Sequence, residues 1–545
     1  MHRRRGRAAG LFGAALLVVA TVLTSGGAHA QPSPSASGHS SDRGEDGDRD
    51  GGRKGDHGKG PATSRPGDGP TTRPADPPAT TATQGARGPA GATGTPGTPG
   101  TTSATASPGG ATAPAARPAP AQGAVLASVE AGADAAVPTS QGLQQALAGA
   151  LADRNLGTVT FAVADAADGR LLYGSGENVP ATPASTTKLA TSIAALSLIP
   201  GDTRLSTRVV RGADAGTVTL VGGGDPTLTA LPADQVQIGG QAADADTAPA
   251  SLDALARQTA AALKAAGTTS VHLDYDLSMY TGSPQHKNHD GQNIALVVPL
   301  MLDEGKVDPR SREEAPARVA DPAGQAAEAF AALLRAQGVA VEGKARAAAA
   351  PAAPGAAVLG RVDSPTVARL VERLLTTSDN QLAEAMARQV AVAAHQPAGF
   401  EGAATAVTQE LARLGVPMTG VALNDGSGLH PGNTVPPAVL VRLLALAASE
   451  QHPALRPVLT GLPIAGFTGT LGKRYGSGSG SADAAGLIRA KTGTLSGVNT
   501  LAGTVVDADG RLLAFAVMTR TTAPVDTARA AMDRIAARLS ACGCH

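Results

Sequence analysis

The amino-acid sequence predicts a multidomain α+β protein, in which helices from both ends of the folded chain flank an antiparallel sheet of about five strands. Two hairpin patterns predict the sheet, with turns at Asp168-Gly169 and Asp509-Gly510. Asp-Gly between alternating apolar runs is a strong short-range hairpin signal. A third strand pattern, residues 486–493, precedes the second hairpin. Helical periodicity at 141–154 and 525–539 predicts the two flanking helices.

The sequence between these ends contains helical patterns and a second group of strand patterns. Strand patterns at 216–224 and 269–280 accompany a helical pattern at 251–266. We therefore expect an inserted mixed domain at 202–359, which interrupts a main domain formed by residues 138–201 and 360–545. The helical subdomain of the main domain is expected to contain helices at 187–198, 367–392 and 435–450.

The N-terminal quarter of the chain is not expected to fold. Residues 1–30 have the pattern of a signal peptide, with basic residues, an apolar stretch from Leu11 to Leu23 and Ala28-His29-Ala30 at the cleavage site. The apolar stretch is shorter than the roughly 20 residues of a bilayer span, so we expect export, with membrane attachment only if the signal is retained. Residues 31–137 are rich in Pro, Gly, Ser and Thr and predict a disordered spacer.

Composition excludes some classes of function. The formal net charge is zero, with 45 basic and 45 acidic residues, whereas a nucleic-acid-binding protein normally has a basic excess. The chain has no tryptophan and only ten phenylalanines and tyrosines together, which argues against binding by aromatic stacking. Cys542 and Cys544 lie too close together to staple the fold, and we expect a frayed tail in preference to a metal site with His545.

The first motif that carries chemistry is Ser185-Thr186-Thr187-Lys188, which opens an apolar helical run. Residues three apart in a helix lie on one face, so the Lys188 amine can reach the Ser185 hydroxyl. Nine of the 45 basic residues are lysines, and a desolvated lysine can release its proton whereas arginine effectively cannot. The pattern predicts a serine nucleophile beside a lysine base, with a solvated surface lysine as the alternative.

The second motif is Ser378-Asp379-Asn380, which precedes a helical pattern with Leu382 and Met386 on one face. A short polar triplet in this place commonly caps a helix. In the catalytic interpretation, Ser378 relays a proton to the leaving group and Asn380 holds a substrate amide.

The third motif, Lys491-Thr492-Gly493-Thr494, lies on the predicted third strand of the sheet. An exposed edge strand can pair with an extended peptide, while Lys491 and the hydroxyls of Thr492 and Thr494 hold a carboxylate. Gly493 would let a ligand approach the backbone closely. The alternative is an edge strand that carries a solubilising lysine.

Together and in this order, the three motifs are the signature of serine β-lactamases and penicillin-binding proteins. The chain resembles that superfamily, which implies a helix-rich subdomain beside the antiparallel sheet. Ser378 follows Ser185 by 193 positions, more than one helical subdomain needs. Such an insertion is typical of the D-alanyl-D-alanine carboxypeptidase/endopeptidase family, the class C low-molecular-mass penicillin-binding proteins. Stretches at 220–228, 298–309 and 424–429 are similar to that family too, although His430 stands where the family has Ser.

The resemblance implies acyl transfer that needs no metal and no cofactor. Ser185 would attack the carbonyl of the penultimate D-Ala with Lys188 as base, and the backbone N–H groups of Ser185 and Thr494 would form the oxyanion hole. Ser378, with Lys491 near it, would pass the proton to the leaving amine. The implied partners are peptidoglycan peptides ending in D-Ala-D-Ala and, as covalent inhibitors, β-lactam antibiotics, at the cell envelope or outside the cell.

Other functions stay open at this stage. A β-lactamase would use the same three motifs but needs a placed deacylation base, and the sequence offers no clear candidate. A non-catalytic wall-binding protein with a relic site is a second alternative, which the intact motif residues argue against. An α/β-hydrolase esterase is disfavoured because the chain has no Gly-x-Ser-x-Gly elbow.

Overall fold

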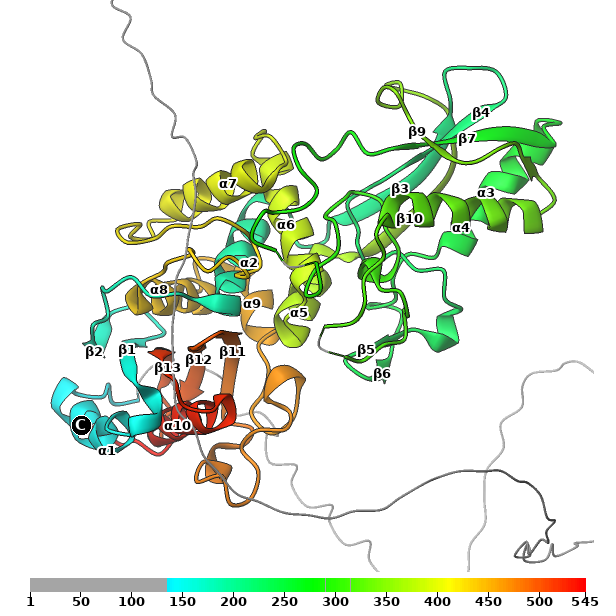
Figure 1. The fold of residues 1–545 in the computed structure, drawn as a ribbon. Coiled ribbons are helices and arrows are strands. Elements are labelled where there is room, and N and C mark those ends of the chain that lie inside the picture. The colour runs from blue at the N-terminus through cyan, green and yellow to red at the C-terminus, as the bar shows by residue number, and fades with distance from the viewer. Residues whose placement is uncertain (1–134, 290, 314) are drawn as a thin grey trace, which may run out of the picture. The chain divides into compact units, whose positions relative to one another are not determined.

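The structure is a computed structural model that describes residues 135–289, 291–313 and 315–545 (Figure 1). The predicted signal peptide, residues 1–30, lies outside the described residues, as does the predicted spacer up to residue 134. Among the described residues, no helix is long and apolar enough to cross a membrane.

A five-stranded antiparallel sheet joins the two ends of the folded chain, which confirms the predicted fold class. Its strand order is β11-β12-β13-β1-β2, so the strand that carries the third motif lies at an edge. Both predicted hairpins form, and their turn residues Gly169 and Gly510 have φ angles of 75° and 88°, which glycine adopts without the steric cost of a Cβ. The strands are β1 (Thr158–Asp165), β2 (Leu171–Ser175), β11 (Ile488–Leu495), β12 (Val498–Val506) and β13 (Leu512–Arg520).

Side chains on the two faces of this sheet enter two separate cores. Phe515 of β13 packs in the core that the terminal helices α1 (Ser140–Leu151) and α10 (Val525–Ser540) cover, whereas its neighbour Ala516 faces the helical side. This division follows from the strand period of two. The helical face is lined by small residues that let helix α8 (Pro437–Ala448) approach the strands, and these are Ala162, Ala164, Ala502, Ala514 and Ala516.

Helix α2 (Thr187–Leu198) is the centre of the helical part. Every residue of α2 from Thr187 to Leu196 is buried, because α2 packs against helices α5 to α8. A helix that is enclosed in this way holds its polar residues rigidly and away from water. The neighbouring helices are α5 (Val367–Thr377), α6 (Asn380–Ala393) and α7 (Phe400–Arg413), with the short α9 (Pro457–Thr460) beside α5 and α8.

The helical pattern predicted at 367–392 is two helices, and the break falls on the second motif. Ser378 has a φ of 60° and ends α5, while Asp379 is the N-cap of α6 and accepts a hydrogen bond of 2.9 Å from the Leu382 N–H. Apolar periodicity alone does not detect this break, because both helices present apolar faces to the same core.

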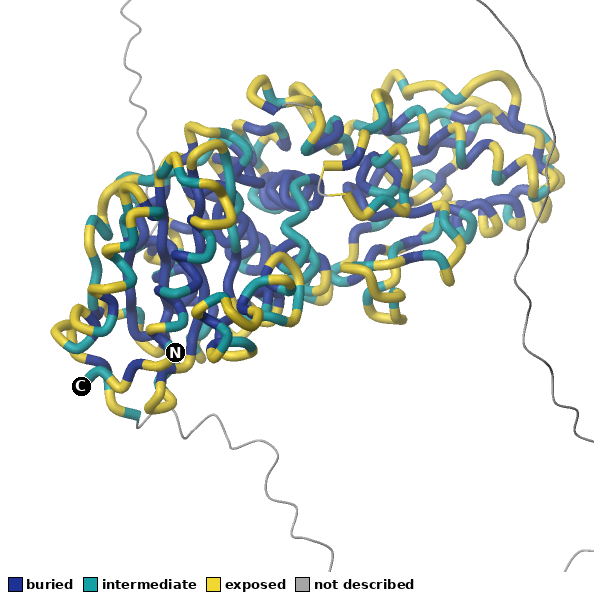
Figure 2. Tube along the Cα trace, turned by 60° about the horizontal axis from the view of Figure 1, so that its bottom comes forward, coloured by how far each residue is buried: buried dark blue, intermediate teal, exposed yellow. Residues whose placement is uncertain are grey.

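A second, mixed sheet is built mainly from the stretch that was predicted as an insertion, although its strand β10 runs beyond residue 359 to Thr366. Its strand order is β10-β3-β4-β7-β8, with β9 beside β7, and β4 pairs with β7 in parallel. Helices α3 (Leu252–Ala265) and α4 (Pro322–Ala336) contribute to its separate apolar core. Figure 2 shows buried segments in the interior of the folded chain and exposed ones in the loops around it. The domain boundaries at 202 and 359 stay a prediction. The strands are β3 (Arg204–Arg211), β4 (Thr217–Val221), β7 (Ser270–Asp276), β8 (Ala340–Val341), β9 (Arg346–Ala347) and β10 (Val358–Thr366), with a separate hairpin of β5 (Gln237–Ile238) and β6 (Gln241–Ala242).

The prediction of a frayed C-terminal tail is wrong. Cys542 is buried in the core beneath α10, and the Thr139 N–H donates a hydrogen bond of 2.6 Å to the Cys544 carbonyl. Cys542 and Cys544 are joined in a disulfide, so the structure does not present them as a pair of thiolate ligands. The tail therefore packs against the start of α1.

Candidate active site

Ser185 and Lys188 face one another at the start of α2. Ser185 lies in the single 3₁₀ turn η3 (Ala184–Thr186), which leads directly into the helix. Lys188 is fully buried, and its Nζ donates a hydrogen bond of 3.0 Å to Ser185 Oγ. The alternative of a solvated surface lysine is therefore excluded for Lys188.

Two further acceptors surround the Lys188 amine. Lys188 Nζ lies 2.7 Å from Asn380 Oδ1 and 2.7 Å from the Ser427 carbonyl oxygen. Burial lowers the pKa of Lys188 to about 8, although the negative charges of Asp425 and Glu384 act in the opposite direction. At a mildly alkaline pH this amine therefore loses its proton far more readily than an exposed lysine does.

Ser378 and Lys491 form a second hydroxyl–amine pair. The left-handed backbone of Ser378, between α5 and α6, leaves its Oγ 2.9 Å from Lys491 Nζ, which also donates to the Thr492 carbonyl at 2.7 Å. Lys491 is fully buried, and burial together with the charge of Lys188 lowers its pKa. The alternative of a solubilising edge lysine is therefore excluded as well.

The free edge of β11 begins beside these lysines. Residues 463–465 pair with the outer edge of β11 as far as Ala490, whose N–H donates to the Pro463 carbonyl at 2.9 Å. Backbone groups of every second residue face the same edge, so those of Thr492 and Thr494 come next on that edge. The Thr492 hydroxyl lies 2.7 Å from the Thr470 hydroxyl.

Gly493 is required by the protein's own packing. A Cβ at this position would lie 2.9 Å from the Ser185 backbone nitrogen and 2.8 Å from the Pro183 carbonyl oxygen. The Thr500 hydroxyl also donates to Pro183 O at 2.8 Å. A ligand was predicted to approach the backbone at this glycine, whereas the close approach in the structure is that of the turn that carries Ser185.

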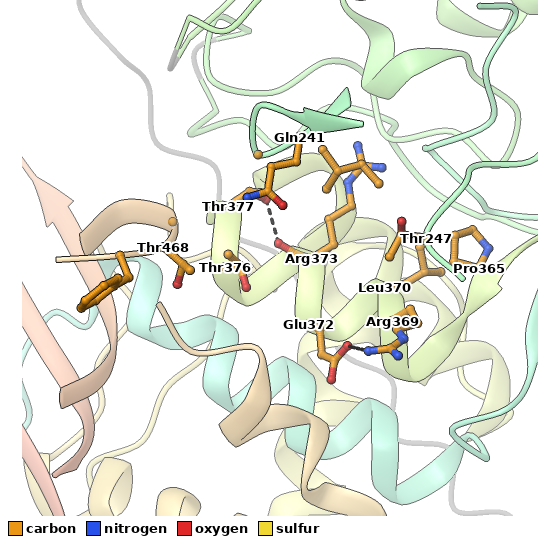
Figure 3. A pocket seen from close by; sticks show the side chains of 14 residues that line it. Gln241, Thr247, Pro365, Arg369, Leu370, Glu372, Arg373, Thr376, Thr377 and Thr468 are labelled. Atoms are coloured by element: carbon orange, nitrogen blue, oxygen red, sulfur yellow. Dashed lines mark hydrogen bonds and ion pairs between the residues drawn. The ribbon is translucent and has the colours of Figure 1, made fainter. Parts of the chain in front are cut away.

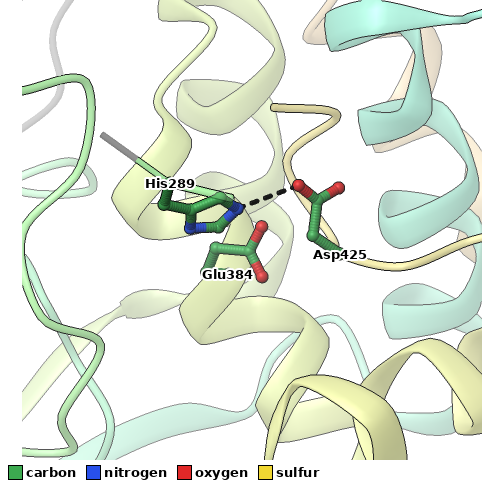
Figure 4. A group of neighbouring side chains, drawn as sticks. All are labelled: His289, Glu384 and Asp425. Atoms are coloured by element: carbon green, nitrogen blue, oxygen red, sulfur yellow. Dashed lines mark hydrogen bonds and ion pairs between the residues drawn. The ribbon is translucent and has the colours of Figure 1, made fainter. Parts of the chain in front are cut away.

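A buried group of His289, Glu384 and Asp425 supports the loop that contains Ser427 (Figure 4). The N–H of Ser427 donates to Glu384 Oε1 at 2.8 Å, and that of Gly426 donates to the same carboxylate at 3.0 Å. His289 Nε2 lies 3.0 Å from Asp425 Oδ2. Although these three side chains are metal-ligating types, both carboxylates already accept hydrogen bonds, and we interpret the group as an anchor for the loop.

His430 lies at the rim of the same loop. Its N–H donates to Asp425 Oδ2 at 2.6 Å, and its ring stands edge-on to that of His286, with 4.9 Å between ring centres. The ring also contacts the Asn288 side chain. Burial lowers the pKa of His430, so a neutral ring is favoured at this rim.

The structure thus brings together all the predicted site residues around one centre, from η3, α2, the start of α6 and β11. It also adds residues that the sequence analysis did not assign. Ser427 lies in the stretch 424–429, which was noted only for its family resemblance. The second is Arg529 of α10, whose Nη2 donates a hydrogen bond of 3.0 Å to Thr494 Oγ1. The sequence did not indicate this role, because an arginine on an amphipathic helix is typical of a solvated face.

Comparison with known proteins identifies the family of the chain. Residues 143–317 and 309–539 match the model of the D-Ala-D-Ala carboxypeptidase 3 (S13) family. The chain belongs to this family, and it is therefore a peptidase, a class of hydrolase.

Individual relatives support the assignment over most of the chain. It is 38% identical to Carboxypeptidase DacB of Mycolicibacterium smegmatis over 419 residues, which is 75% of this chain and 86% of that protein. It is 36% identical to a carboxypeptidase of Mycobacterium tuberculosis, covering 80% of this chain and 91% of that protein. Among solved structures, penicillin binding protein 4 from Haemophilus influenzae superposes with a TM-score of 0.57 at 19% identity, over 73% of this chain and 98% of that one, which shows a shared fold.

Proposed function

We propose that this chain is a serine D-Ala-D-Ala carboxypeptidase that forms an acyl-enzyme on Ser185 and is inhibited covalently by β-lactams. The observation that carries the proposal is the fully buried Lys188 amine, 3.0 Å from the Ser185 hydroxyl and with its pKa lowered by burial to about 8. A general base works best when its pKa lies near the working pH. The family assignment supports the substrate class, and a related Haemophilus influenzae protein has been solved with a β-lactam.

The hydrogen bonds around Lys188 favour its action as the base. A neutral amine has two N–H donors and one lone pair. Asn380 Oδ1 and Ser427 O, each 2.7 Å from Nζ, can accept the two hydrogens, and the lone pair then points at Ser185 Oγ. Lys188 removes the Ser185 proton as Oγ bonds to the carbonyl carbon of the penultimate D-Ala. The N–H groups of Ser185 and Thr494 stabilise the resulting oxyanion.

Departure of the leaving group needs a proton on its nitrogen. Ser378 Oγ, 2.9 Å from Lys491 Nζ, relays that proton: it gives its own to the nitrogen as the C–N bond breaks and regains the one that Lys188 took from Ser185, while Lys491 holds the hydroxyl in place. The hydroxyls of Thr492 and Thr494 hold the carboxylate of the leaving D-Ala, with Arg529 adding positive charge beside Thr494. Asn380 accepts from Lys188 through Oδ1, so its Nδ2, which lies 3.3 Å from the Asn293 carbonyl oxygen, is the group that donates to the substrate amide. Water then releases the acyl group from Ser185.

The same acyl-enzyme serves endopeptidase chemistry, in which the leaving amine belongs to a cross-linked peptide. We propose that the signal peptide predicted at residues 1–30 directs export of the protein, and that the protein then acts on peptidoglycan at the cell envelope. A β-lactamase and a relic wall-binding protein are the rival functions. They predict, respectively, rapid turnover of penicillin and no covalent labelling by it.

The decisive experiment is mass spectrometry of the penicillin-treated protein with peptide mapping, combined with an assay of D-Ala release from a D-Ala-D-Ala peptide. We expect one adduct on Ser185, slow release of the drug and measurable D-Ala. Ser185→Ala should lose both the adduct and the D-Ala signal. An adduct on another residue would overturn the proposal, and fast drug hydrolysis would favour the β-lactamase.

A further inference from the structure

A buried glutamate from the stretch predicted as an insertion reaches the second motif of the active site. Glu304 is 4% exposed, and its carboxylate accepts a hydrogen bond from Arg373 Nη2 and pairs with Lys306 Nζ at 2.5 Å. It also shares a hydrogen bond with the carboxyl group of Asp379, the middle residue of that motif. Glu304 therefore contacts the residue that joins the two catalytic side chains of the motif, although the reaction described so far gives it no part.

The backbone around Glu304 has a conformation that is unusual for residues other than glycine. Asp303 and Glu304 have φ angles of 50° and 60°, within the short turn η5 (Asp303–Gly305). A Cβ meets a steric cost in this left-handed region, so such a turn persists only where its surroundings hold it. The Glu304 N–H donates a hydrogen bond of 2.8 Å to the Pro226 carbonyl, and the preceding N–H donates one of the same length to the Leu228 carbonyl. These bonds fix the direction in which the Glu304 carboxylate points.

Several carboxyl groups share the positive charges of Arg373 and Lys306. Burial and the charge of Glu304 raise the pKa of Asp379 to about 7, so its carboxyl group keeps a proton below that pH. Asp379 Oδ1 accepts a hydrogen bond of 2.9 Å from the Leu382 N–H, which leaves the other oxygen to carry the proton and donate it to Glu304. The group of interacting carboxyls consists of Asp225, Asp303, Glu304 and Asp379.

The Asp379 side chain is thereby held at both of its oxygens, and the turn that carries Ser378 is held with it. Ser378 ends α5 with a φ of 60°, so the direction of its hydroxyl depends on how its neighbours are anchored. Arg373 ties the Glu304 carboxylate to the same end of α5, because the Thr377 hydroxyl donates a hydrogen bond of 2.7 Å to the Arg373 carbonyl (Figure 3). Glu304 thus contacts both sides of the Ser378 turn.

We propose that Glu304 is a positioning residue for the reaction: by accepting a hydrogen bond from the Asp379 carboxyl group, it keeps Ser378 directed at the leaving nitrogen. The inference rests on the proposed function, in which Ser378 gives its proton to that nitrogen as the C–N bond breaks. Glu304 acts through Asp379 and does not need to contact the substrate. A misplacement of about 1 Å at a reacting group can cost about 10²-fold in rate, so loss of this contact should slow the proton transfer.

Two leaving groups separate this role from general support of the fold. An amine must take up a proton when its C–N bond breaks, whereas sulfur leaves as a thiolate without one when a C–S bond breaks. At about pH 6, below the pKa of Asp379, kcat/KM is measured for the full chain with a D-Ala-D-Ala peptide and with a thioester that has the same acyl group. We expect Glu304→Ala to lower the ratio of amide to thioester cleavage by about 10²-fold. The stoichiometry of penicillin labelling reports the folded fraction of each variant.

Glu304→Asp tests the contact without removing the negative charge. The shorter side chain keeps the counter-charge of Arg373 but withdraws its oxygens by one methylene, and we expect the ratio to fall by about 10-fold. Lys306→Met is the matched control, because it removes an ion-pair partner of the same carboxylate and leaves Asp379 in place. It should leave the ratio unchanged.

An unchanged ratio in both Glu304 variants would overturn the inference. An equal loss of both rates would overturn it too, since it would indicate a role in stability alone. If Glu304→Ala takes up no penicillin, the ratio in Glu304→Asp gives the answer. The proposed function survives each of these results. A wild-type protein that cleaves neither substrate and forms no adduct on Ser185 would instead refute the proposed function.

Discussion

The Lys188 amine and the Ser427 carbonyl oxygen lie 2.7 Å apart, although 239 residues separate them in the sequence. This bond fixes where the proposed base directs its hydrogens, and therefore where its lone pair points. The loop that carries the Ser427 carbonyl is held by the Glu384 carboxylate, which accepts hydrogen bonds from the N–H groups of Gly426 and Ser427. The orientation of Lys188 thus depends on a loop as well as on its own helix.

Removal of the Lys188 amine should slow acylation of Ser185 while the fold remains intact. We expect Lys188→Met to lower the rate of penicillin acylation by about 10²–10⁴-fold, the usual contribution of a general base. Stopped-flow labelling with a fluorescent penicillin measures this rate. Lys473→Met, at an exposed lysine, is the control and should match the wild type. A Lys188→Met protein with the wild-type rate and pH profile would show that another group is the base.

The acylation rate should rise with pH as Lys188 loses its proton. Since the pKa of Lys188 is lowered to about 8, the rate should increase through that pH and level off above it. The negative charge of Asp425 stabilises the Lys188 ammonium, so Asp425→Asn should lower that pKa and move the rise to lower pH. Asp214→Asn, at an exposed site, should leave the profile in place. A shift of the Asp425→Asn profile to higher pH would contradict the assignment.

A methyl group at position 493 should disturb both the fold and the active site. The Cβ of Gly493→Ala would lie 2.9 Å from the Ser185 nitrogen, and relief of that contact must move β11 or the turn. We expect a loss of about 1–3 kcal/mol in the free energy of unfolding, together with slower acylation. Urea unfolding and the labelling rate measure the two effects. Gly476→Ala is the control, because a Cβ there would meet nothing within 4 Å.

The ion pair between Arg373 and Glu304 should be important for stability. The two side chains are 16% and 5% exposed. The positive charge of Arg373 also faces Asp379. Burial and the charge of Glu304 raise the pKa of Asp379 to about 7. Arg373→Met removes this positive charge from beside Asp379 and leaves Glu304 with Lys306 as its remaining counter-charge. We expect a loss of about 3–5 kcal/mol in the free energy of unfolding. Arg170→Met, at an exposed pair with Asp168, should cost less than about 1 kcal/mol. Equal midpoints of urea unfolding for the two variants would contradict this prediction.

Much of the architecture was predictable because its signals are local. The Asp-Gly turns at Gly169 and Gly510 give the two hairpins, and apolar periodicity gives α2 and α10. The triplet 378–380 was expected to cap a helix, as Asp379 does, but the end of a separate helix α5 at Ser378 was not predicted, because it depends on a left-handed residue held by its surroundings and not on a helix-breaking residue type. The packed C-terminal tail was missed for a similar reason, since its contact with Thr139 joins positions 405 residues apart.

The sequence by itself determined the residue types of the site and their order, from Ser185 and Lys188 through Ser378 to Lys491, since spacing along a helix or strand fixes which neighbours share a face. Only the tertiary structure decided the state of those residues. Burial of Lys188 and Lys491 lowers their pKa values, and the backbone of Ser427 completes the shell around Lys188. The desolvation of a lysine amine, and the direction in which a neighbouring carbonyl group points, depend on every element packed around that amine. No single stretch of sequence specifies that packing.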